Sequence, residues 1–468
     1  MANIRDQCSW VHMHEHAEAT VKSKDLVRMA VAKANLIEPL GTLTLPVTKS
    51  AFVLGGGVAG LTAALAIADQ GFAVTLAEKS PTLGGNALRA GFTLDGRDIT
   101  GYVKELIARV RKHERITVYT GARLEAVDGF VGNFKSRLSL SDGKAGVREV
   151  EVEHGVAVIA AGGFESTPQE YLYGRNGRVK TLLETGELIG RPDFEVPDTV
   201  VFIQCVGSRE PDHPYCSRLC CSGAIKNAIR MKQKNPQARI FILYRDMRTY
   251  GFRERHYAQA REMGIVFVQY DPEAKPVVRE SAFGNGKPGI TVRVRDKILG
   301  AELEIPTDLL VLSSRIEPNR ENERLGKLYK VPLTAEGFFL EAHVKLRPVE
   351  FATDGVYVAG ISHYPKDVDE SVSQAMAAAG RAVTVLAKDT VEAGGKTAYI
   401  NPARCSACGA CVTVCAYNAI SIDEEKEVAV VNEILCKGCG ACVATCKGSA
   451  ANLKGFKDEQ ILSVINAL

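Results

Sequence analysis

Eight cysteines near the end of the sequence form two runs with the same C-x2-C-x2-C-x3-C spacing. The runs comprise Cys405, Cys408, Cys411 and Cys415, and then Cys436, Cys439, Cys442 and Cys446. This spacing is typical of bacterial ferredoxins with two [4Fe–4S] clusters, in which the fourth cysteine of each run ligates the cluster of the other run. We therefore expect one cluster on the first three cysteines of the first run with Cys446, and another on the first three of the second run with Cys415. Two zinc sites are the alternative.

Four more cysteines, Cys205, Cys216, Cys220 and Cys221, lie within a short segment in the middle of the chain. Four thiolates suit a [4Fe–4S] cluster or a structural zinc ion. Their C-x10-C-x3-C-C spacing fits no standard zinc or ferredoxin pattern, and the adjacent pair is difficult to place on one zinc tetrahedron without backbone strain. The segment predicts a third, non-standard iron–sulfur cluster. Ordinary buried thiols are the alternative, because free cysteine is often buried.

A glycine-rich loop, Gly55-x-Gly57-x-x-Gly60, follows a short apolar strand and opens a helical pattern, and the next apolar run ends at Glu78. In a dinucleotide-binding unit, the first glycine allows the tight turn, the second lets the backbone approach the pyrophosphate, and the third lets helix and strand pack closely. The phosphates then face the free N–H groups of the helix, and Glu78 can accept hydrogen bonds from the ribose hydroxyls. A tight βα turn without a ligand is the alternative.

Three further segments favour FAD over NAD as the dinucleotide. They resemble the E-K-x4-G-G run, the apolar strand with its glycine turn, and the last FAD motif of flavoproteins with two dinucleotide-binding domains. The residues that this resemblance assigns to FAD are Lys79, Gly84, Gly85, Ala161, Gly162, Gly360 and Ile361. Ile361 stands where an acid is usual in the last motif.

The second dinucleotide domain carries no fingerprint of its own. No GxGxxG follows a strand between Thr199 and Leu312, and no C-x-x-C pair occurs between residues 49 and 392. We therefore expect neither hydride transfer from a nicotinamide nor electron transfer through a dithiol. The middle cysteines occupy the position instead.

Several segments, spread over most of residues 1–450, resemble the A subunit of heterodisulfide reductase. In that enzyme the A subunit carries flavin and iron–sulfur centres. The segments are C-S-W-V-H at 8–12, Q-C-V-G-S-R at 204–209, Y-C-S-R-L-C-C at 215–221, A-I-K-N-A at 224–228, L-Y-R-D-M-R-T-Y-G at 243–251, P-K-D at 365–367 and E-S-V at 370–372. The resemblance implies that the middle quartet holds a non-standard cluster beside the FAD. It also places Lys226 near the flavin ring as a catalytic residue, where a cation would stabilise reduced flavin. A solvated helix residue is the plainer interpretation of Lys226.

The sequence starts almost at the C-S-W-V-H segment, so we expect a short form without the N-terminal cluster domain and the inserted ferredoxin of long family members. Cys8 is then a remnant of the missing domain, a ligand shared with a partner chain, or inert. His12, His14 and His16 alternate and would share a face on a strand, but before a helix they are more readily explained as solvated.

The composition is that of a globular protein, and the tight clusters of cysteines indicate metal or redox chemistry in a reducing cytoplasm rather than structural disulfides. The 468 residues are 46% hydrophobic with a net charge of +3, which is too small to indicate nucleic acid as a partner. No stretch approaches ~18 uninterrupted apolar residues, so no membrane span is expected, and the first twenty residues lack the apolar core of a secretion signal.

The expected fold is a thioredoxin-reductase-like α/β flavoprotein with two dinucleotide-binding-type domains and a C-terminal α+β bacterial 2[4Fe–4S] ferredoxin domain. We divide the chain into an N-terminal helical segment (1–48), an FAD domain (49–197 and 335–392), a second nucleotide-binding-like domain (198–334), the ferredoxin domain (397–455) and a terminal helix (456–468). The segment at 393–395 is expected to be a flexible joint.

The resemblance implies an FAD and iron–sulfur electron-transfer subunit with one FAD and three [4Fe–4S] clusters, which serves as a hub for flavin-based electron bifurcation or confurcation. It also implies partners: B- and C-like subunits of heterodisulfide reductase, an electron-donor module such as a hydrogenase or formate dehydrogenase, and a second copy of this chain. An NAD(P)H-dependent flavin oxidoreductase like the small subunit of glutamate synthase is the alternative enzyme, and a zinc-holding scaffold is an alternative outside enzymes.

Overall fold

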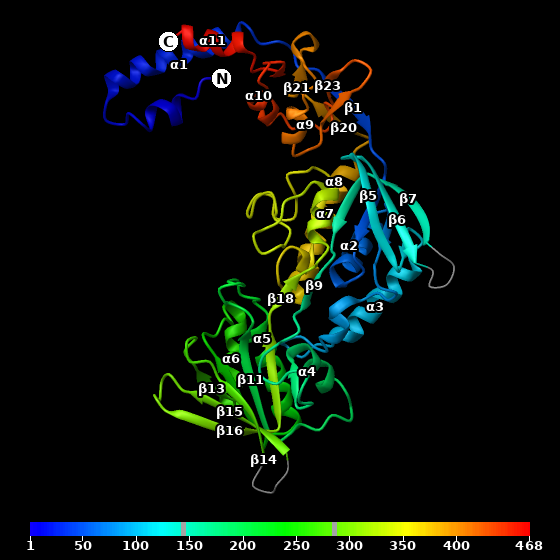
Figure 1. The fold of residues 1–468 in the computed structure, drawn as a ribbon, viewed down its shortest axis with the longest axis vertical. Helices are drawn as coiled ribbons and strands as arrows, with labels where there is room; N and C mark the ends of the chain where they lie inside the picture. Colours follow the sequence, from blue (N-terminus) through cyan, green and yellow to red (C-terminus); the bar gives the residue numbers. More distant parts are fainter. Residues whose placement is uncertain (142–146, 283–287) are drawn as a thin grey trace. The chain divides into compact units, whose positions relative to one another are not determined.

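The computed structural model describes residues 1–141, 147–282 and 288–468, which form two units (Figure 1). One unit comprises Met1–Pro46 together with Asp389–Leu468, and the other comprises Val47–Lys388. Within the described residues, no helix is both long enough and apolar enough to cross a membrane.

The first sheet of the larger unit is parallel, with strand order β19-β8-β2-β3-β4. Its strands are β2 (Ser50–Leu54), β3 (Ala73–Ala77), β4 (Ile116–Tyr119), β8 (Val156–Ile159) and β19 (Val356–Val358). Helices α2 (Val58–Ala68), α3 (Ile99–Lys112) and α8 (Val368–Leu386) pack beside it. An antiparallel meander follows in β5 (Ala122–Phe130), β6 (Asn133–Ser141) and β7 (Val147–His154). Helix α2 is apolar on nearly every side because α8 and α3 cover what the sheet leaves open.

The second sheet of this unit is also parallel, with strand order β10-β17-β11-β12-β13. Its strands are β10 (Val179–Thr181), β11 (Thr199–Val206), β12 (Arg239–Tyr244), β13 (Val266–Gln269) and β17 (Leu309–Ser314). Its helices are α4 (Leu182–Ile189), α5 (Cys220–Lys234) and α6 (Glu254–Glu262), and an antiparallel sheet adds β14 (Val277–Ala282), β15 (Pro288–Arg295) and β16 (Glu302–Thr307). Every residue of β11 is buried, as expected for a central strand covered on both faces.

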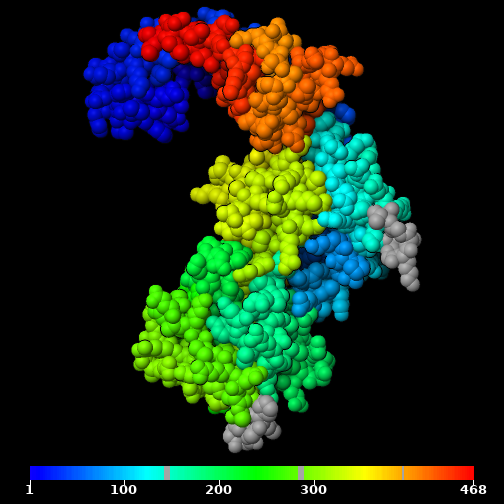
Figure 2. All heavy atoms as spheres, viewed as in Figure 1, coloured from blue at the N-terminus to red at the C-terminus, as the bar shows by residue number. Residues whose placement is uncertain are grey.

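The chain crosses between the two sheets through an antiparallel pair, β9 (Gly163–Glu165) and β18 (Ile316–Pro318). Sheet membership therefore divides the chain earlier than the expected boundaries after 197 and 334. β10 pairs with β17, and α7 (Asn322–Tyr329) packs into the core of the first sheet through Leu325 and Tyr329. Figure 2 shows the yellow C-terminal part of this unit lying against its blue and cyan N-terminal part.

The smaller unit contains the two cysteine runs. Its helices are α1 (His16–Ala34), α9 (Ala410–Val414), α10 (Ala441–Thr445) and α11 (Asp458–Asn466), and its strands pair as β1 (Thr42–Pro46) with β20 (Thr390–Gly394), β21 (Ala398–Ile400) with β24 (Ala451–Leu453), and β22 (Ile420–Asp423) with β23 (Val428–Val431). The expectation of a flexible joint at 393–395 was wrong for most of that segment, because β20 pairs with β1 along its whole length. Helix α11 packs on α1, and Lys457 forms an ion pair with Glu38 at 2.6 Å.

The core of the first sheet contains one fully buried histidine, His154. Its ring stacks between Phe52 and Phe134, with ring centroids 5.2 and 5.5 Å away. Nδ1 donates to the carbonyl of Val156 at 2.9 Å, so Nε2 accepts from the Ser136 hydroxyl at 2.9 Å. Burial lowers the pKa of His154 from 6.5 to about 4, and the folded protein holds this ring neutral.

This histidine makes folding stability depend on pH. Below pH 6.5 the unfolded chain protonates His154 whereas the folded chain does not, so stability falls as the pH decreases towards 4. Between pH 7.5 and 5.5 this histidine should cost about 1 kcal/mol. Chemical denaturation at both pH values under anaerobic conditions should show that His154→Phe loses this part of the pH dependence, although it is less stable throughout. Substitution of the exposed His14 by Gln should leave the dependence unchanged, and an unchanged dependence in His154→Phe would contradict the assignment.

Candidate functional site

A cavity of about 790 Å³ lies within the Val47–Lys388 unit, beside the carboxyl ends of β2 and β8. It gathers most of the residues that the sequence assigned to FAD, although these come from distant segments. Its lining includes Gly57, Glu78, Lys79, Gly84, Gly85, Ala161, Gly162, Gly360, Ile361 and, from the second sheet's side, Lys226. The carboxyl edge of a parallel sheet is the usual place for a dinucleotide.

The other two glycines of the loop, Gly55 and Gly60, hold the backbone rather than line the cavity. A Cβ on Gly60 would lie 1.8 Å from the Gly55 carbonyl oxygen, and one on Gly55 would lie 2.2 Å from the Ala160 carbonyl oxygen. Gly57 differs, because a Cβ there would meet no atom within 4 Å. Gly57 is also the N-cap of α2 and offers no capping side chain, so the first N–H groups of the helix stay open towards the cavity.

The carboxylate of Glu78 closes the loop against the end of β3. One oxygen accepts from the Gly56 N–H at 2.6 Å, and the other accepts from the Ser80 N–H at 2.8 Å. The bare helix terminus, the close-packed glycines and this fixed carboxylate together fit a pyrophosphate and ribose. The cavity therefore suits FAD.

A half-buried lysine, Lys226, and a buried lysine, Lys366, line the cavity, and the sequence assigned only Lys226 to the site. Lys226 of α5 donates to the Ala90 carbonyl at 2.8 Å and lies 4.8 Å from the centre of the Phe92 ring. Burial lowers its pKa to about 8. Lys366 donates to the carbonyls of Gly360 and Tyr364, both at 2.8 Å, and burial lowers its pKa to about 7. The P-K-D segment before α8 was the signal for Lys366, but only the folded chain shows that it reaches the cavity.

The middle cysteines lie at the end of β11 and the start of α5. Cys205, Cys220 and Cys221 are buried, while Cys216 is partly exposed. Cys205 has a positive φ of 61°, which is rare for a side chain of this type, and β11 is irregular at this point of its pairing with β17. Such local strain is common at functional sites.

Burial and nearby positive charge have opposite effects on the pKa values of these thiols. Burial raises the pKa of Cys205 and Cys220, and it raises the pKa of Cys221 to about 12. Thiolates are therefore stable here only with added positive charge, which a metal cluster would provide. Gln204, 1% exposed beside Cys205, has no hydrogen-bond partner for either side-chain amide atom among the described residues. The thiol chemistry and this unpaired amide fit an iron–sulfur cluster.

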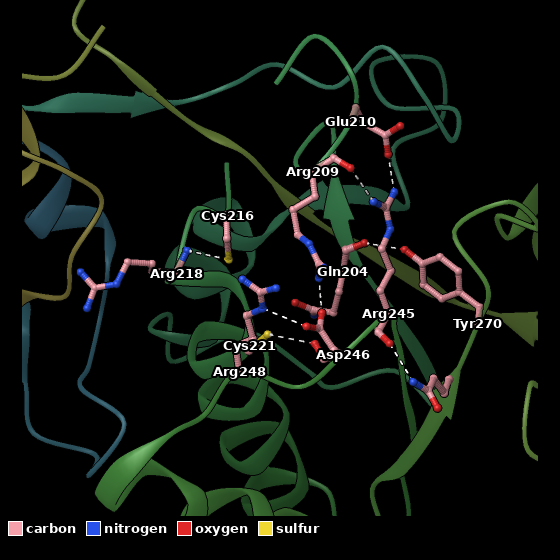
Figure 3. A network of polar contacts seen from close by, with 11 residues as sticks. Gln204, Arg209, Glu210, Cys216, Arg218, Cys221, Arg245, Asp246, Arg248 and Tyr270 are labelled. Atoms are coloured by element: carbon pink, nitrogen blue, oxygen red, sulfur yellow. Dashed lines mark hydrogen bonds and ion pairs between the residues drawn. The ribbon is translucent and has the colours of Figure 1, made fainter. Parts of the chain in front are cut away.

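Several arginines lie near Cys216 and Cys221 of the quartet, as Figure 3 shows. Arg209 and Arg248 both pair with Asp246, and Arg245 pairs with Glu210. The backbone N–H of Arg218 donates to the Cys216 Sγ at 3.3 Å. The Arg218 guanidinium donates to the Pro365 carbonyl and to the carboxylate of Glu370, which lines the cavity. One residue thus connects the cysteine segment with the cavity wall.

The two cysteine runs of the smaller unit adopt nearly the same backbone. Helix α9 begins after Gly409 (φ 75°) and α10 after Gly440 (φ 79°), and each helix ends at the fourth cysteine of its run. Backbone N–H groups donate to the sulfurs of four cysteines, Cys405, Cys415, Cys436 and Cys446, at 3.2–3.5 Å. These bonds lower the pKa of Cys446. Sulfurs that accept N–H bonds in two repeated loops fit iron–sulfur ligation.

The N-terminal candidates do not assemble into a site. The Cys8 thiol is buried and donates to the Ala19 carbonyl at 2.9 Å, and His12 pairs with Glu15 at 2.7 Å. His14 and His16 are exposed. In the part of the chain that the structure describes, no group of three or more histidine, cysteine or acidic side chains is arranged around a single metal ion.

Comparison with known proteins agrees with both halves of this description. A family model described as FAD dependent oxidoreductase matches residues 51–151, and a 4Fe-4S dicluster domain matches residues 404–451. These matches confirm the predicted FAD domain and the ferredoxin domain. Among solved structures, the chain is similar to thioredoxin reductase from T. acidophilum, with a TM-score of 0.48, 16% identity, and coverage of 72% of this chain and 98% of that one.

Curated relatives resemble almost the whole chain. It is 35% identical over 515 residues to the second iron-sulfur A subunit of CoB–CoM heterodisulfide reductase of Methanopyrus kandleri, covering 91% of this chain and 78% of the relative. It is 34% identical over 513 residues to the A subunit of H(2):CoB-CoM heterodisulfide,ferredoxin reductase of Methanothermobacter thermautotrophicus, covering 90% and 77%.

The loop glycines give a prediction that separates flavin binding from folding. Gly57→Ala adds a methyl group in open space beside the helix terminus, so the chain should fold normally but bind FAD roughly tenfold or more weakly, about 1.4 kcal/mol. Gly60→Ala forces a methyl group onto the Gly55 carbonyl and should destabilise the fold by about 1–3 kcal/mol. Flavin absorbance after equilibrium dialysis and thermal unfolding of the flavin-free protein measure the two effects. Gly380→Ala, in open space within α8, should leave the flavin affinity unchanged and stabilise the fold slightly, by up to about 1 kcal/mol, because alanine favours a helix interior. Normal flavin affinity in Gly57→Ala would show that the phosphates lie elsewhere.

Proposed function

This chain belongs to the heterodisulfide reductase A-subunit family, and we propose that it joins one FAD to three [4Fe–4S] clusters, two in the ferredoxin domain and one on the middle quartet. The chain is an oxidoreductase, an FAD and iron–sulfur electron-transfer subunit of a multi-subunit complex. The number of clusters and the roles of individual residues belong to the proposal.

A single helix, α5, carries the main support for this wiring. Its first two residues, Cys220 and Cys221, belong to the quartet, while Ser222, Gly223 and Lys226 line the cavity. At 1.5 Å of rise per residue, five residues span only about 7.5 Å of helix. A cluster on the quartet and a flavin in the cavity would therefore be neighbours. In the second dinucleotide-binding-type domain, cysteines stand where a nucleotide loop would otherwise be.

The residues divide the work around the bound groups. When bound, FAD supplies two-electron chemistry and the clusters supply one-electron transfer. The open N-terminus of α2 binds the pyrophosphate, and Glu78 orients the ribose. Lys226, with its pKa near 8, holds or releases a proton at Nζ on the cavity wall. Arg218 fixes the cysteine segment to that wall through Glu370, at 2.9 Å.

The partners of this chain are also part of the proposal. We place the chain in a cytoplasmic complex with heterodisulfide reductase B- and C-like subunits, a second copy of itself and an electron-donor module, such as a hydrogenase or formate dehydrogenase. In that complex it serves as the hub of flavin-based electron bifurcation or confurcation. The relatives' names support a complex of this kind: both are designated A subunits, and one names H(2) and ferredoxin.

Iron content tests the number and position of the clusters. Anaerobically purified protein should hold about twelve iron atoms per FAD, in three four-iron clusters. Cys205→Ser combined with Cys216→Ser should remove about four of them, and Cys408→Ser combined with Cys439→Ser about eight. Iron, sulfide and flavin quantification with electron paramagnetic resonance measures each loss.

Cys8→Ser is the matched control, because Cys8 is a buried thiol outside all three sets, and it should lose no iron. Full iron content in the Cys205/Cys216 variant would refute the middle cluster. Rapid flavin reduction by NADH alone would favour the oxidoreductase of the glutamate-synthase small-subunit type instead.

A further inference from the structure

Two arginines and one aspartate form a clamp over one side of the middle quartet. Arg209 follows β11, whereas Asp246 and Arg248 follow β12, so adjacent parallel strands deliver the three side chains to the same edge. Asp246 pairs through one oxygen with Arg209, and through the other with Arg248 Nε at 2.9 Å. Figure 3 shows both guanidinium groups converging on this carboxylate.

The clamp lies beside three of the four cysteines. The positive charge of Arg209 opposes the rise that burial causes in the pKa of Cys205, and Arg248 interacts electrostatically with Cys216. The Cys221 thiol lies 3.9 Å from the backbone carbonyl of Asp246. Two cations and one anion leave one excess positive charge beside the sulfurs. Cys220 lies away from the clamp, near the Ser314 carbonyl.

The arginines of this segment are not a free basic surface for an acidic partner. Arg248 pairs with Asp246, Arg253 with Asp367, and Arg255 with Asp95. Arg245, almost fully buried, pairs with Glu210, which also binds Lys275. Arg209 and Arg248 share the single carboxylate of Asp246, so one positive charge is left over beside the sulfurs.

We propose that Arg209 and Arg248, oriented by Asp246, act as positioning residues that raise the reduction potential of the cluster on the middle quartet. This inference rests on the proposed presence of that cluster. Reduction adds one electron and therefore one negative charge, with no bond made or broken in the protein. A cation close to the sulfurs stabilises that added charge, the more so in a partly buried site where water screens it weakly. Asp246 opposes the effect electrostatically but holds both guanidinium groups in place.

Charge and scaffolding make different predictions for the three residues. In redox titrations of the full chain followed by electron paramagnetic resonance, Arg209→Gln and Arg248→Gln should shift the midpoint of the middle cluster to more negative potential. Arg209→Lys and Arg248→Lys keep the charge and should restore most of the wild-type value. Asp246→Asn removes an anion and should shift the midpoint to more positive potential. If the three residues had only a structural role, the midpoint potential of the middle cluster would shift in the same direction in all the Gln and Asn variants, or would not shift. Either result would overturn the proposal.

Internal references make the experiment decisive. The signal that disappears in Cys216→Ser identifies the middle cluster, and the ferredoxin-domain signals should keep their potentials in every clamp variant. Arg123→Gln, which breaks the pair of Arg123 with Glu321 on the first sheet's side, should shift nothing. If an arginine variant loses iron, Asp246→Asn still tests the proposal. An unchanged or more negative midpoint potential of the middle cluster in that variant would also overturn it. Absence of a third titrating signal in the wild-type chain would instead refute the three-cluster assignment itself.

Discussion

Burial of cysteine sulfur in the middle of the chain is the constraint on which the rest of the site depends. Burial raises the pKa of Cys205, Cys220 and Cys221, so thiolates are favourable there only beside compensating positive charge. The surrounding structure supplies part of that charge through Arg209 and Arg248. Bound iron would supply the rest. An all-apolar environment would keep these thiols protonated and unable to act as ligands.

Burial and neighbouring charge also set the pKa values of the groups that line the cavity. Lys226 and Lys366 are held in protein where burial lowers their pKa to about 8 and about 7, so both can change protonation near neutral pH. Asp367, beside Lys366, has its pKa raised to about 6 by burial, while its partner Arg253 works against that rise. A cavity wall with groups of this kind suits chemistry in which electrons arrive with protons. Helix α5 joins this wall to the quartet, and Arg218 adds a second connection through Glu370.

In the ferredoxin domain, much of the geometry around the sulfurs is local. Cys415 and Cys446 accept backbone N–H bonds from residues four positions further along, whereas Cys405 and Cys436 accept from Ala429 and Ala398 elsewhere in the domain. Gly409 and Gly440 adopt the left-handed conformation that starts each short helix. Ligand spacing and turn geometry lie within one short segment of chain, and repetition of the segment repeats the geometry. The middle quartet depends instead on neighbours from β12 and on the segment that precedes α8, which are remote in sequence.

This contrast explains what the sequence determined by itself and what only the folded chain decided. The cysteine runs, and the glycine loop with the following apolar run that ends at Glu78, were predicted from spacing and periodicity, because neighbouring residues impose them. The place of Lys366 in the cavity, the pairing of β10 with β17, the pairing of β20 with β1 and the stacking of His154 were not deducible. The acidic partners of Arg245, Arg248, Arg253 and Arg255 were not deducible either. These features depend on contacts between distant segments, whose free energies appear only when the chain has packed and water has been removed from between its charges.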